Sequence, residues 1–288
     1  VGREGGVQAL RFLACYDLYF LLTRIMGRDD ARHPWLYDRI RQFEAAPDGY
    51  LDLWARDHYK STIITFAGTI QEILRDPEIT IGVFSHTRPI ATNFVRQIKT
   101  EFENNGLLQD LFPFIKQPSG GETRPWGESM LCVKRTKNPK EQTLEAGGIV
   151  QGQLISKHFD LRIYDDLVTP ESVTGPDMIK KTTDAFVLSE NLGTRGGRAR
   201  AIGTRYHHND TYSTLIDRQV FTPRVFPATH NGKADGNPVF LTLEELERKR
   251  RTMGSYIFGC QMLQAPSPDE GAIFRRDWIR YWDKLPKR

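Results

Sequence analysis

The sequence predicts an α/β protein with a mostly parallel central sheet flanked by helices. A strand-like apolar run at residues 50–55 is followed by a helix-like run at residues 61–74, and a second strand and helix follow at residues 80–85 and 89–104. A later strand-like run ends in a pair of aspartates. Strands that alternate with helices are typical of parallel sheets, which bind their ligands at the carboxyl ends of the strands.

The composition is that of a globular protein. The 288 residues allow one large or two small domains, and 39% hydrophobic with 11% aromatic residues is enough for a core. The net charge of +4, from 40 basic and 36 acidic residues, is compatible with a polyanionic partner but does not require one. Cys15, Cys132 and Cys260 predict neither a metal site nor a disulfide framework, so we expect a reducing compartment. No apolar run approaches the length of a membrane span, so no membrane partner is expected.

Two helices are expected before the first strand, at residues 7–26 and 34–44, and residues 1–48 are predicted to form an N-terminal lid or bracket. The helix at residues 61–74 is predicted from apolar residues that recur at helical spacing over a wide stripe. Pro89 suits the first turn of the helix that follows the second strand.

The second half of the chain continues the alternation of strands and helices. The expected elements are an irregular segment at residues 113–138, strands at residues 142–152 and 160–164, a helix at residues 176–192, a strand at residues 198–204, a helix at residues 211–219, a strand at residues 222–229 and a helix at residues 242–253. The last helix has acidic residues in its first turn and basic residues in its last, as the helix dipole favours.

Residues 53–62 join the first strand to its helix and have the layout of a phosphate-binding loop. Backbone N–H groups of such a loop point at one spot, and the helix dipole adds positive potential there. Lys60 is expected to lie between the β- and γ-phosphates of ATP, and Ser61 to offer its hydroxyl to Mg²⁺. The predicted ATP-binding residues are Arg56, Asp57, His58, Tyr59, Lys60, Ser61 and Thr62.

The loop departs from the usual glycine-rich pattern. Trp54 and Tyr59 occupy the positions of its two glycines. The alternative interpretation is an ordinary helix N-terminus with Ser61 near its cap. Arg56, four residues before Lys60, is a candidate to stabilise the charge of phosphoryl transfer, although a surface position is the commoner one for an arginine.

The aspartate pair supplies the other half of the predicted site. Asp165 is expected to hold Mg²⁺, and Asp166 to orient or deprotonate the attacking water. The pair can also open a turn before Pro170. Its position about a hundred residues after Lys60, behind intervening strand–helix units, favours the functional interpretation. About 40 residues further on, Thr204 ends a strand, where its hydroxyl can sense the γ-phosphate or simply close the strand.

In order and spacing, these motifs resemble the ATPase domain of the large terminase subunit of tailed bacteriophages, from about His33 to the end of the chain. The matching segments are residues 53–62 as an arginine-bearing Walker A motif, residues 83–87 with Ala91, residues 161–166 as Walker B, residues 203–210 as the coupling motif and the turn after it, and residues 271–278. By position, the resemblance makes Arg56, Lys60 and Asp166 catalytic, Ser61 and Asp165 metal ligands, and Gly203, Thr204 and Arg205 coupling residues.

The resemblance implies a RecA-like P-loop NTPase fold of the additional-strand type over residues 49–270. It implies an Mg²⁺-dependent ATPase that drives double-stranded viral DNA through the portal protein into a procapsid in the host cytoplasm. It also implies a homo-oligomeric ring, commonly a pentamer, that works with a small terminase subunit. Residues 271–288 would be a linker toward a nuclease domain that this chain does not include, so no DNA cleavage is expected.

Two departures from the family bear on mechanism. Asp166 stands where the family usually has a catalytic glutamate, and its shorter arm can hold water less well. Lys157 stands where many relatives have an arginine before Walker B that reaches a neighbour's ATP. Lys157 is therefore the candidate trans-acting residue, although lysine lacks the planar fork of arginine.

A basic cluster leads into the coupling motif. Arg195, Arg198, Arg200 and Arg205 lie within eleven residues that contain no acid. The first three are candidate DNA-binding residues, because such a cluster can follow phosphates without reading the base sequence. The cluster can equally line the nucleotide site or a subunit interface, or form a solvated face.

Two other functions are compatible with the sequence. One is a nucleotide- or DNA-binding scaffold that has lost hydrolysis, since both loop glycines and the family's glutamate are missing. The other is a different P-loop nucleic-acid motor, such as a helicase. Against a helicase, the sequence shows neither a second RecA domain nor its paired arginine motif.

Overall fold

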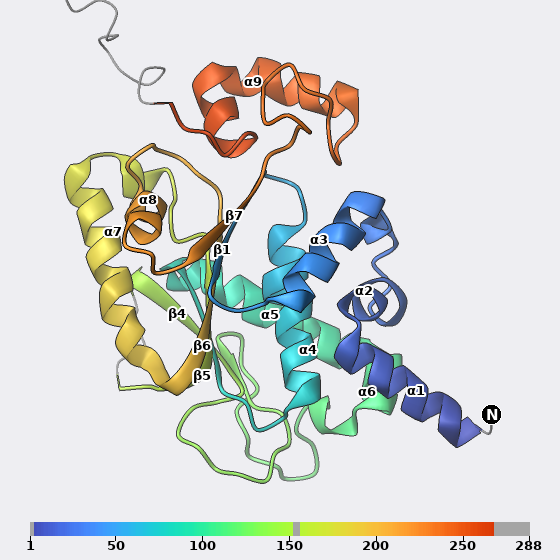
Figure 1. Cartoon of the computed structure of the whole chain (residues 1–288). Coiled ribbons are helices and arrows are strands. Elements are labelled where there is room, and N and C mark those ends of the chain that lie inside the picture. Colours follow the sequence, from blue (N-terminus) through green and yellow to red (C-terminus); the bar gives the residue numbers. More distant parts are fainter. Residues whose placement is uncertain (1–2, 152–155, 268–288) are drawn as a thin grey trace, which may run out of the picture.

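The computed structural model describes residues 3–151 and 156–267 as an α/β fold, in which a seven-stranded, mostly parallel sheet is flanked by helices (Figure 1). The strands lie in the order β3-β4-β2-β5-β6-β1-β7, and the described pairs are parallel except β3 with β4. The strands are β1 (Tyr50–Trp54), β2 (Ile81–Thr87), β3 (Met130–Leu131), β4 (Leu144–Gln151), β5 (Phe159–Asp165), β6 (Gly193–Gly203) and β7 (Thr222–Phe226). The α-helices are α1 (Arg3–Tyr16), α2 (Leu18–Phe20), α3 (Pro34–Ala45), α4 (Gly68–Arg75), α5 (Arg88–Asn104), α6 (Gly106–Leu111), α7 (Pro176–Ser189), α8 (Thr211–Asp217) and α9 (Leu243–Gln261).

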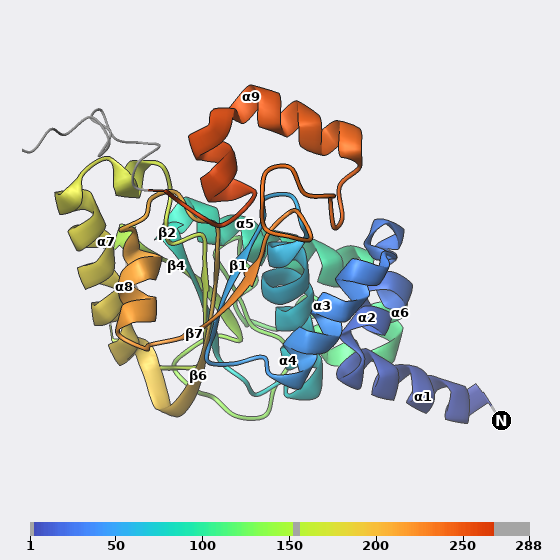
Figure 2. The ribbon, with the colours of Figure 1, turned by 45° about the horizontal axis from the view of Figure 1, so that its top comes forward.

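Helices cover both faces of the sheet (Figures 1 and 2). The yellow helix α7 and the orange helix α8 cover one face, and α4 and α5 cover the other, with α1, α2, α3 and α6 outside them. Helix α9 lies across the end of the molecule at which β1 and β7 finish. Over the described part of the chain, no helix is both long enough and apolar enough to cross a membrane.

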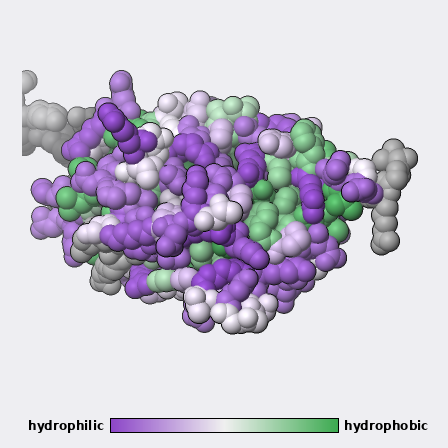
Figure 3. Space-filling view, turned by 90° about the horizontal axis from the view of Figure 1, so that it is seen from below, coloured by the Kyte–Doolittle hydropathy of each residue, from purple (hydrophilic) through white to green (hydrophobic). Residues whose placement is uncertain are grey.

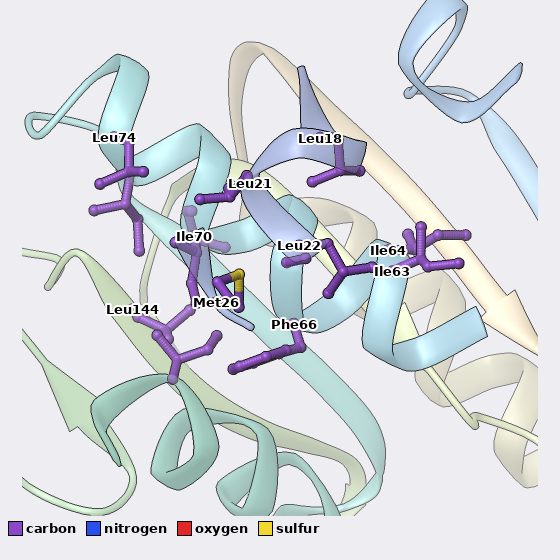
Figure 4. Packing of buried hydrophobic residues seen from close by; sticks show 14 of the residues in the cluster. Leu18, Leu21, Leu22, Met26, Ile63, Ile64, Phe66, Ile70, Leu74 and Leu144 are labelled. Carbon is purple, nitrogen blue, oxygen red and sulfur yellow. The ribbon is translucent and has the colours of Figure 1, made fainter. Parts of the chain in front are cut away.

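The core on the α4 face is continuous with the N-terminal helices (Figure 4). Its labelled side chains, all buried, are Leu18, Leu21, Leu22, Met26, Ile63, Ile64, Phe66, Ile70, Leu74 and Leu144. Burial of this apolar surface stabilises the folded protein by about 25 cal/mol for each Å² removed from water. The N-terminal helices therefore share the core of the sheet domain and fix the helix that follows the phosphate loop.

The structure confirms the predicted succession of strands and helices and changes several boundaries. The expected helix at residues 7–26 is interrupted at Asp17, which accepts a hydrogen bond of 2.7 Å from the Phe20 N–H and begins α2. Gly254, with a φ of 70°, divides α9, and a second helical segment extends to Gln261. Strand β6 begins at Gly193, so Arg195, Arg198 and Arg200 lie in a strand and Arg205 follows it. Helix α6 was not predicted.

Strand β6 lies between β1 and β5, so the carboxyl ends of these three strands are neighbours. The register pairs Leu53 with Gly203 and Asp165 with Ile202. The phosphate loop, the aspartate pair and the coupling segment therefore reach the same edge of the sheet, where parallel sheets bind their ligands.

Replacing Gly203 with Ala is expected to destabilise the protein. A Cβ at residue 203 would lie 2.0 Å from the hydroxyl of Tyr212, which accepts from the Leu167 N–H and donates to the Ile202 carbonyl. Tyr212 is fully buried, so overpacking should cost about 1–3 kcal/mol. Urea unfolding measures this loss. The control Gly6→Ala, at an open and exposed position of α1, should gain up to about 1 kcal/mol; equal stability of the two variants would contradict the prediction.

Candidate active site

The loop between β1 and the π-helical segment η3 (Thr62–Ala67) surrounds a hollow of about 200 Å³. Residues 56–62 and Asp166 line it. Asp57 and Tyr59 have positive φ angles of 63° and 65°, in a region that glycine adopts most easily. Left-handed residues at alternate positions can turn backbone N–H groups toward one point and form an anion-binding concavity. The loop backbone is thus suited to an anion although it contains no glycine.

A non-glycine residue in the left-handed region costs on the order of 1–3 kcal/mol. Two side-chain contacts hold Asp57 and Tyr59 in this conformation. The Tyr59 hydroxyl donates to Asp30, and Lys249 of α9 pairs with Asp57. Burial, and then Asp30, raise the pKa of Tyr59 to about 12, so the phenol remains a donor at neutral pH. Burial alone would raise the pKa of Asp57, but the hydrogen bond and charge of Lys249 outweigh it and lower that pKa.

The His58 side chain is buried beneath the loop. Its ring lies 5.5 Å from each of the rings of Trp35 and Phe240, and its Nδ1 donates to the Arg56 carbonyl at 2.8 Å. Burial lowers the pKa of His58 to about 4, so the ring is neutral near pH 7. Because the side chain packs inside the protein, only the backbone N–H of His58 is available to ATP, and its binding of ATP stays a prediction.

Lys60 and Ser61 meet the two aspartates across the hollow. The Ser61 hydroxyl donates to Oδ1 of Asp165 at 3.1 Å, and Nζ of Lys60 lies 3.7 Å from Oδ1 of Asp166. Thr65, in η3, donates to the other oxygen of Asp165. Segments about a hundred residues apart are thereby brought into one site.

Asp165 is fully buried beside another carboxylate. Burial, and then the charge of Asp166, raise the pKa of Asp165, while Lys60, Thr65 and Ser61 oppose the shift in part. A divalent cation would relieve this repulsion, and the oxygen donors of Ser61 and Asp165 suit Mg²⁺, which binds few protein groups and completes its shell with waters and phosphates. Within residues 3–151 and 156–267, no group of three or more His, Cys, Asp or Glu side chains is placed to hold a metal ion. A nucleotide would thus have to supply some of the ligands.

Asp166 is the accessible member of the pair. Its side chain is 39% exposed, it lines the hollow, and its φ is 51°. Aspartate and asparagine are several-fold enriched among non-glycine residues with positive φ. This backbone conformation gives a physical reason for an aspartate at residue 166.

The three predicted coupling residues have different surroundings. Thr204 is buried, and its Oγ1 has no hydrogen-bond partner among the described residues, so the hydroxyl has unused bonding capacity. Arg205 is fixed, because its Nε lies 2.9 Å from Asp210 and its backbone N–H donates to Gln264 at 3.1 Å. Gly203 packs against a tyrosine ring, as described above.

Four residues that contact the site were not among the predicted site residues: Asp30, Thr65, Tyr206 and Lys249. Arg56 is exposed and donates through Nη1 to the hydroxyl of Tyr206 at 2.9 Å, which joins the loop to the segment after β6. Thr65 had a usable signal, since it lies four residues after Ser61 and so on the same face of a helix. The contacts of Asp30, Tyr206 and Lys249 depend on tertiary structure. Tyr206 does lie within residues 203–210, which resemble the coupling motif, and Lys249 lies among the basic residues that suit the helix dipole.

The structure leaves the Arg200 side chain almost no surface with which to contact DNA, whereas Arg198 is 37% exposed and its contact with DNA stays a prediction. Both arginines bridge Asp48 and Glu72: Nε of Arg200 lies 2.6 Å from Asp48, and Nη2 of Arg198 lies 2.7 Å from Glu72. The Arg200 side chain is only 2% exposed. Together with Asp48 and Glu72, these arginines form a partly buried ion-pair network that joins β6 to α4. Arg195 is exposed, and its contact with DNA stays a prediction.

Lys157 lies just before β5, at the opposite end of this strand from the aspartates. Its Nζ is 3.0 Å from the buried Glu145 of β4. Nine residues of extended strand span about 30 Å, so Lys157 cannot reach the site of its own chain. The ion pair gives it a structural role, and a trans-acting role stays a prediction.

Comparison with known proteins assigns this chain to no family. A scan against protein-family models finds no match to this chain, and no curated protein matches its sequence. The segment at residues 271–278 and the predicted linker at residues 271–288 lie outside the described residues.

Proposed function

We propose that this chain is a RecA-like P-loop ATPase of the additional-strand type, the motor domain of a large terminase subunit. The proposal rests on two contacts at the carboxyl ends of the strands. The Ser61 hydroxyl donates to Asp165 at 3.1 Å, and Nζ of Lys60 lies 3.7 Å from Asp166. An additional strand, β6, lies between the strand of the loop and the strand of the acids, and this order supports the fold assignment.

In this proposal the loop backbone and Lys60 bind the phosphates of ATP. Asp166 orients the attacking water and accepts its proton, since it is the exposed acid that lines the hollow. Arg56, at the mouth of the hollow, adds a planar cation against the charge of the transferred phosphoryl group. When bound by Ser61 and Asp165, Mg²⁺ would neutralise charge on the β- and γ-phosphate oxygens.

The mechanical part of the proposal follows from the motif resemblance. A ring of copies at the portal of a procapsid, in the host cytoplasm, would couple hydrolysis to the movement of double-stranded DNA selected with a small terminase subunit. The coupling segment begins at Thr204, directly beyond β6, and Tyr206 connects this segment to Arg56. A change at the phosphates thus has a direct route into the segment after β6.

The scaffold alternative is weakened by the backbone. Left-handed residues stand in the loop without glycine, and the second acid occupies a position that favours aspartate over glutamate. A helicase would need a second RecA domain, whereas residues 3–151 and 156–267 contain a single sheet.

Phosphate release from MgATP at rising protein concentration tests the proposal. The wild type should turn over ATP more than in proportion to its concentration, because assembly completes the site. Lys60→Ala should lose turnover and bind ATP about tenfold or more weakly, through loss of the phosphate-binding cation. The control Lys180→Ala removes an exposed lysine of α7 and should behave as wild type. ATP binding without turnover in the wild type would leave the scaffold, and full turnover in Lys60→Ala would overturn the site.

A further inference from the structure

The net charge of the chain is concentrated in one segment. Residues 116–140, called the basic segment here, contain six basic and two acidic residues: Lys116, Arg124, Lys134, Arg135, Lys137 and Lys140 against Glu122 and Glu128. Removing these six and two from the chain's 40 basic and 36 acidic residues leaves 34 of each. The rest of the protein is therefore formally neutral, and its excess of +4 lies in 25 consecutive residues.

The basic segment lies at the edge of the sheet opposite to the candidate active site. It follows η4 (Pro113–Ile115), passes through β3 and ends before β4. The backbone N–H groups of Thr136 and Lys137 donate to Glu78, which precedes β2, so the segment is tied to the amino ends of the parallel strands. In Figure 1 it forms the green loops at the end of the molecule remote from α9.

A cavity of about 530 Å³ opens within the basic segment, and Arg124, Lys134, Arg135 and Lys137 are among its lining residues. Arg135 is anchored by its Nη2, which donates to the Glu141 carbonyl at 2.7 Å, and its Nη1 is buried without a partner among the described residues. Cations that line a concave surface reinforce one another's potential there. The cavity is thus an electropositive hollow.

Most of these cations lack a carboxylate partner. Within the described ranges, no carboxylate lies within 4.0 Å of the charged nitrogens of Lys116, Arg135, Lys137 or Lys140, whereas Glu122 is shared by Arg124 at 3.1 Å and Lys134 at 3.9 Å. The Lys134 side chain is 73% exposed. Arg198 and Arg200 of β6 differ, because Asp48 and Glu72 neutralise them, while Arg195 of the same strand is exposed and has no carboxylate partner among the described residues. The basic segment is thus a dense group of cations, most of which lack a carboxylate partner.

The shape and polarity of the basic segment fit a nucleic-acid backbone better than a protein partner. None of the large exposed hydrophobic side chains of the described surface belongs to it, whereas protein interfaces usually have an apolar centre. Gly120 and Gly121 form a tip with positive φ and open space around both residues, which lets a rigid polyanion approach closely. Seen from below in Figure 3, this end of the molecule is mostly hydrophilic, and the apolar area lies toward the N-terminal helices.

We propose that the basic segment is the surface through which this protein grips the phosphate backbone of duplex DNA. The choice of duplex DNA rests on the proposed function, but the surface is defined by its charge and shape alone. Contacts to phosphates carry no sequence information and release counterions, so binding is insensitive to base sequence and falls steeply with salt. Four contacts would give a slope of log K against log salt of about −3.6.

The test is fluorescence anisotropy of the full chain with a labelled duplex of random sequence over a range of salt concentrations. The variant Lys134→Gln/Lys137→Gln removes two exposed cations of the basic segment. Each lost contact should reduce the slope by about 0.9, so affinity at about 0.1 M salt should fall about 60-fold. The control Lys180→Gln/Lys181→Gln removes the same charge from the exposed side of α7 and should change affinity less than about threefold.

Three results would overturn the proposal: equal losses in the two double variants, wild-type slopes near zero, or tighter binding of polyglutamate than of the duplex at equal salt. ATP binding is measured on the same samples and should be unchanged in both variants. A chain that binds DNA through the basic segment but does not bind ATP would sink the proposed function and leave this surface standing. A chain that binds ATP but does not bind DNA through the basic segment would refute only the proposal for this surface.

Discussion

Replacing Asp166 with Asn should reduce ATP turnover by about 10²–10⁴-fold while the fold remains intact. The loss is that of a general base, since an amide can neither accept the proton of the attacking water nor hold it as a carboxylate does. The fold should survive because asparagine tolerates the left-handed backbone at this position, where φ is 51°. The substitution also removes a negative charge next to the buried Asp165, so it relieves a repulsion.

Single-turnover phosphate release at saturating MgATP measures this effect, and thermal unfolding of the same samples checks the fold. The matched control is Asp184→Asn, which neutralises an exposed aspartate of α7 that pairs only with Lys180 among the described residues; it should keep wild-type turnover. If Asp166→Asn retains turnover within about twofold of wild type, Asp166 is not the base and the water must be activated elsewhere.

Replacing Glu72 with Ala should cost about 3–5 kcal/mol of the free energy of unfolding near pH 7, the loss typical of a buried ion pair broken on one side. Glu72 is 8% exposed and accepts hydrogen bonds from both Arg198 and Arg200. Without it, the buried Arg200 would keep Asp48 as its one carboxylate among the described residues.

The same carboxylate predicts how this loss depends on pH. Burial alone would raise the pKa of Glu72, but the hydrogen bond from Arg198 and the charges of both arginines outweigh it and lower the pKa from 4.5 to about 2. Because the folded-state pKa is lowered, Glu72 contributes its full stabilisation above pH 4.5. This contribution to the free energy of unfolding, about 3 kcal/mol, is lost as the pH falls toward 2. Urea unfolding near pH 7 and pH 3 should show the gap between wild type and Glu72→Ala narrowing in acid.

The control for this series is Glu247→Ala, which removes an exposed glutamate paired with Arg250 at 3.8 Å on α9. Surface pairs of this kind contribute less than about 1 kcal/mol. The network is refuted as a stabilising element if Glu72→Ala unfolds within 1 kcal/mol of wild type near neutral pH, or if the gap stays constant with pH.

The sequence predicted a phosphate-binding loop from a lysine–serine pair between a strand and a helix, even though both glycines are missing, and its binding of phosphate stays a prediction. It could not show what replaces the glycines, because the contacts that hold Asp57 and Tyr59 come from residues 192 and 29 positions away. Local propensity describes what a backbone prefers alone, and distant contacts can impose a conformation that it does not prefer.

The basic residues show that the sequence alone does not reveal which cations are paired with carboxylates. The arginines of β6 looked like a DNA-binding cluster because no acid lies near them in the sequence, but Asp48 and Glu72, more than a hundred residues earlier, neutralise Arg198 and Arg200. The basic segment looked merely irregular, yet four of its six cations have no carboxylate partner among the described residues. Counting charges along a chain cannot distinguish these cases, because pairing is decided by which strands become neighbours.

The contacts of Tyr59 with Asp30 and of Asp57 with Lys249 also determine the shortest stretch of chain that can form the complete site. Every recognisable motif of the described site lies between β1 and the segment after β6, and a protein cut to that stretch would contain all of them. Asp30 and Lys249, which hold Tyr59 and Asp57, both lie outside it. The site therefore cannot be transplanted as a module, because its boundaries in the chain are wider than those of its motifs.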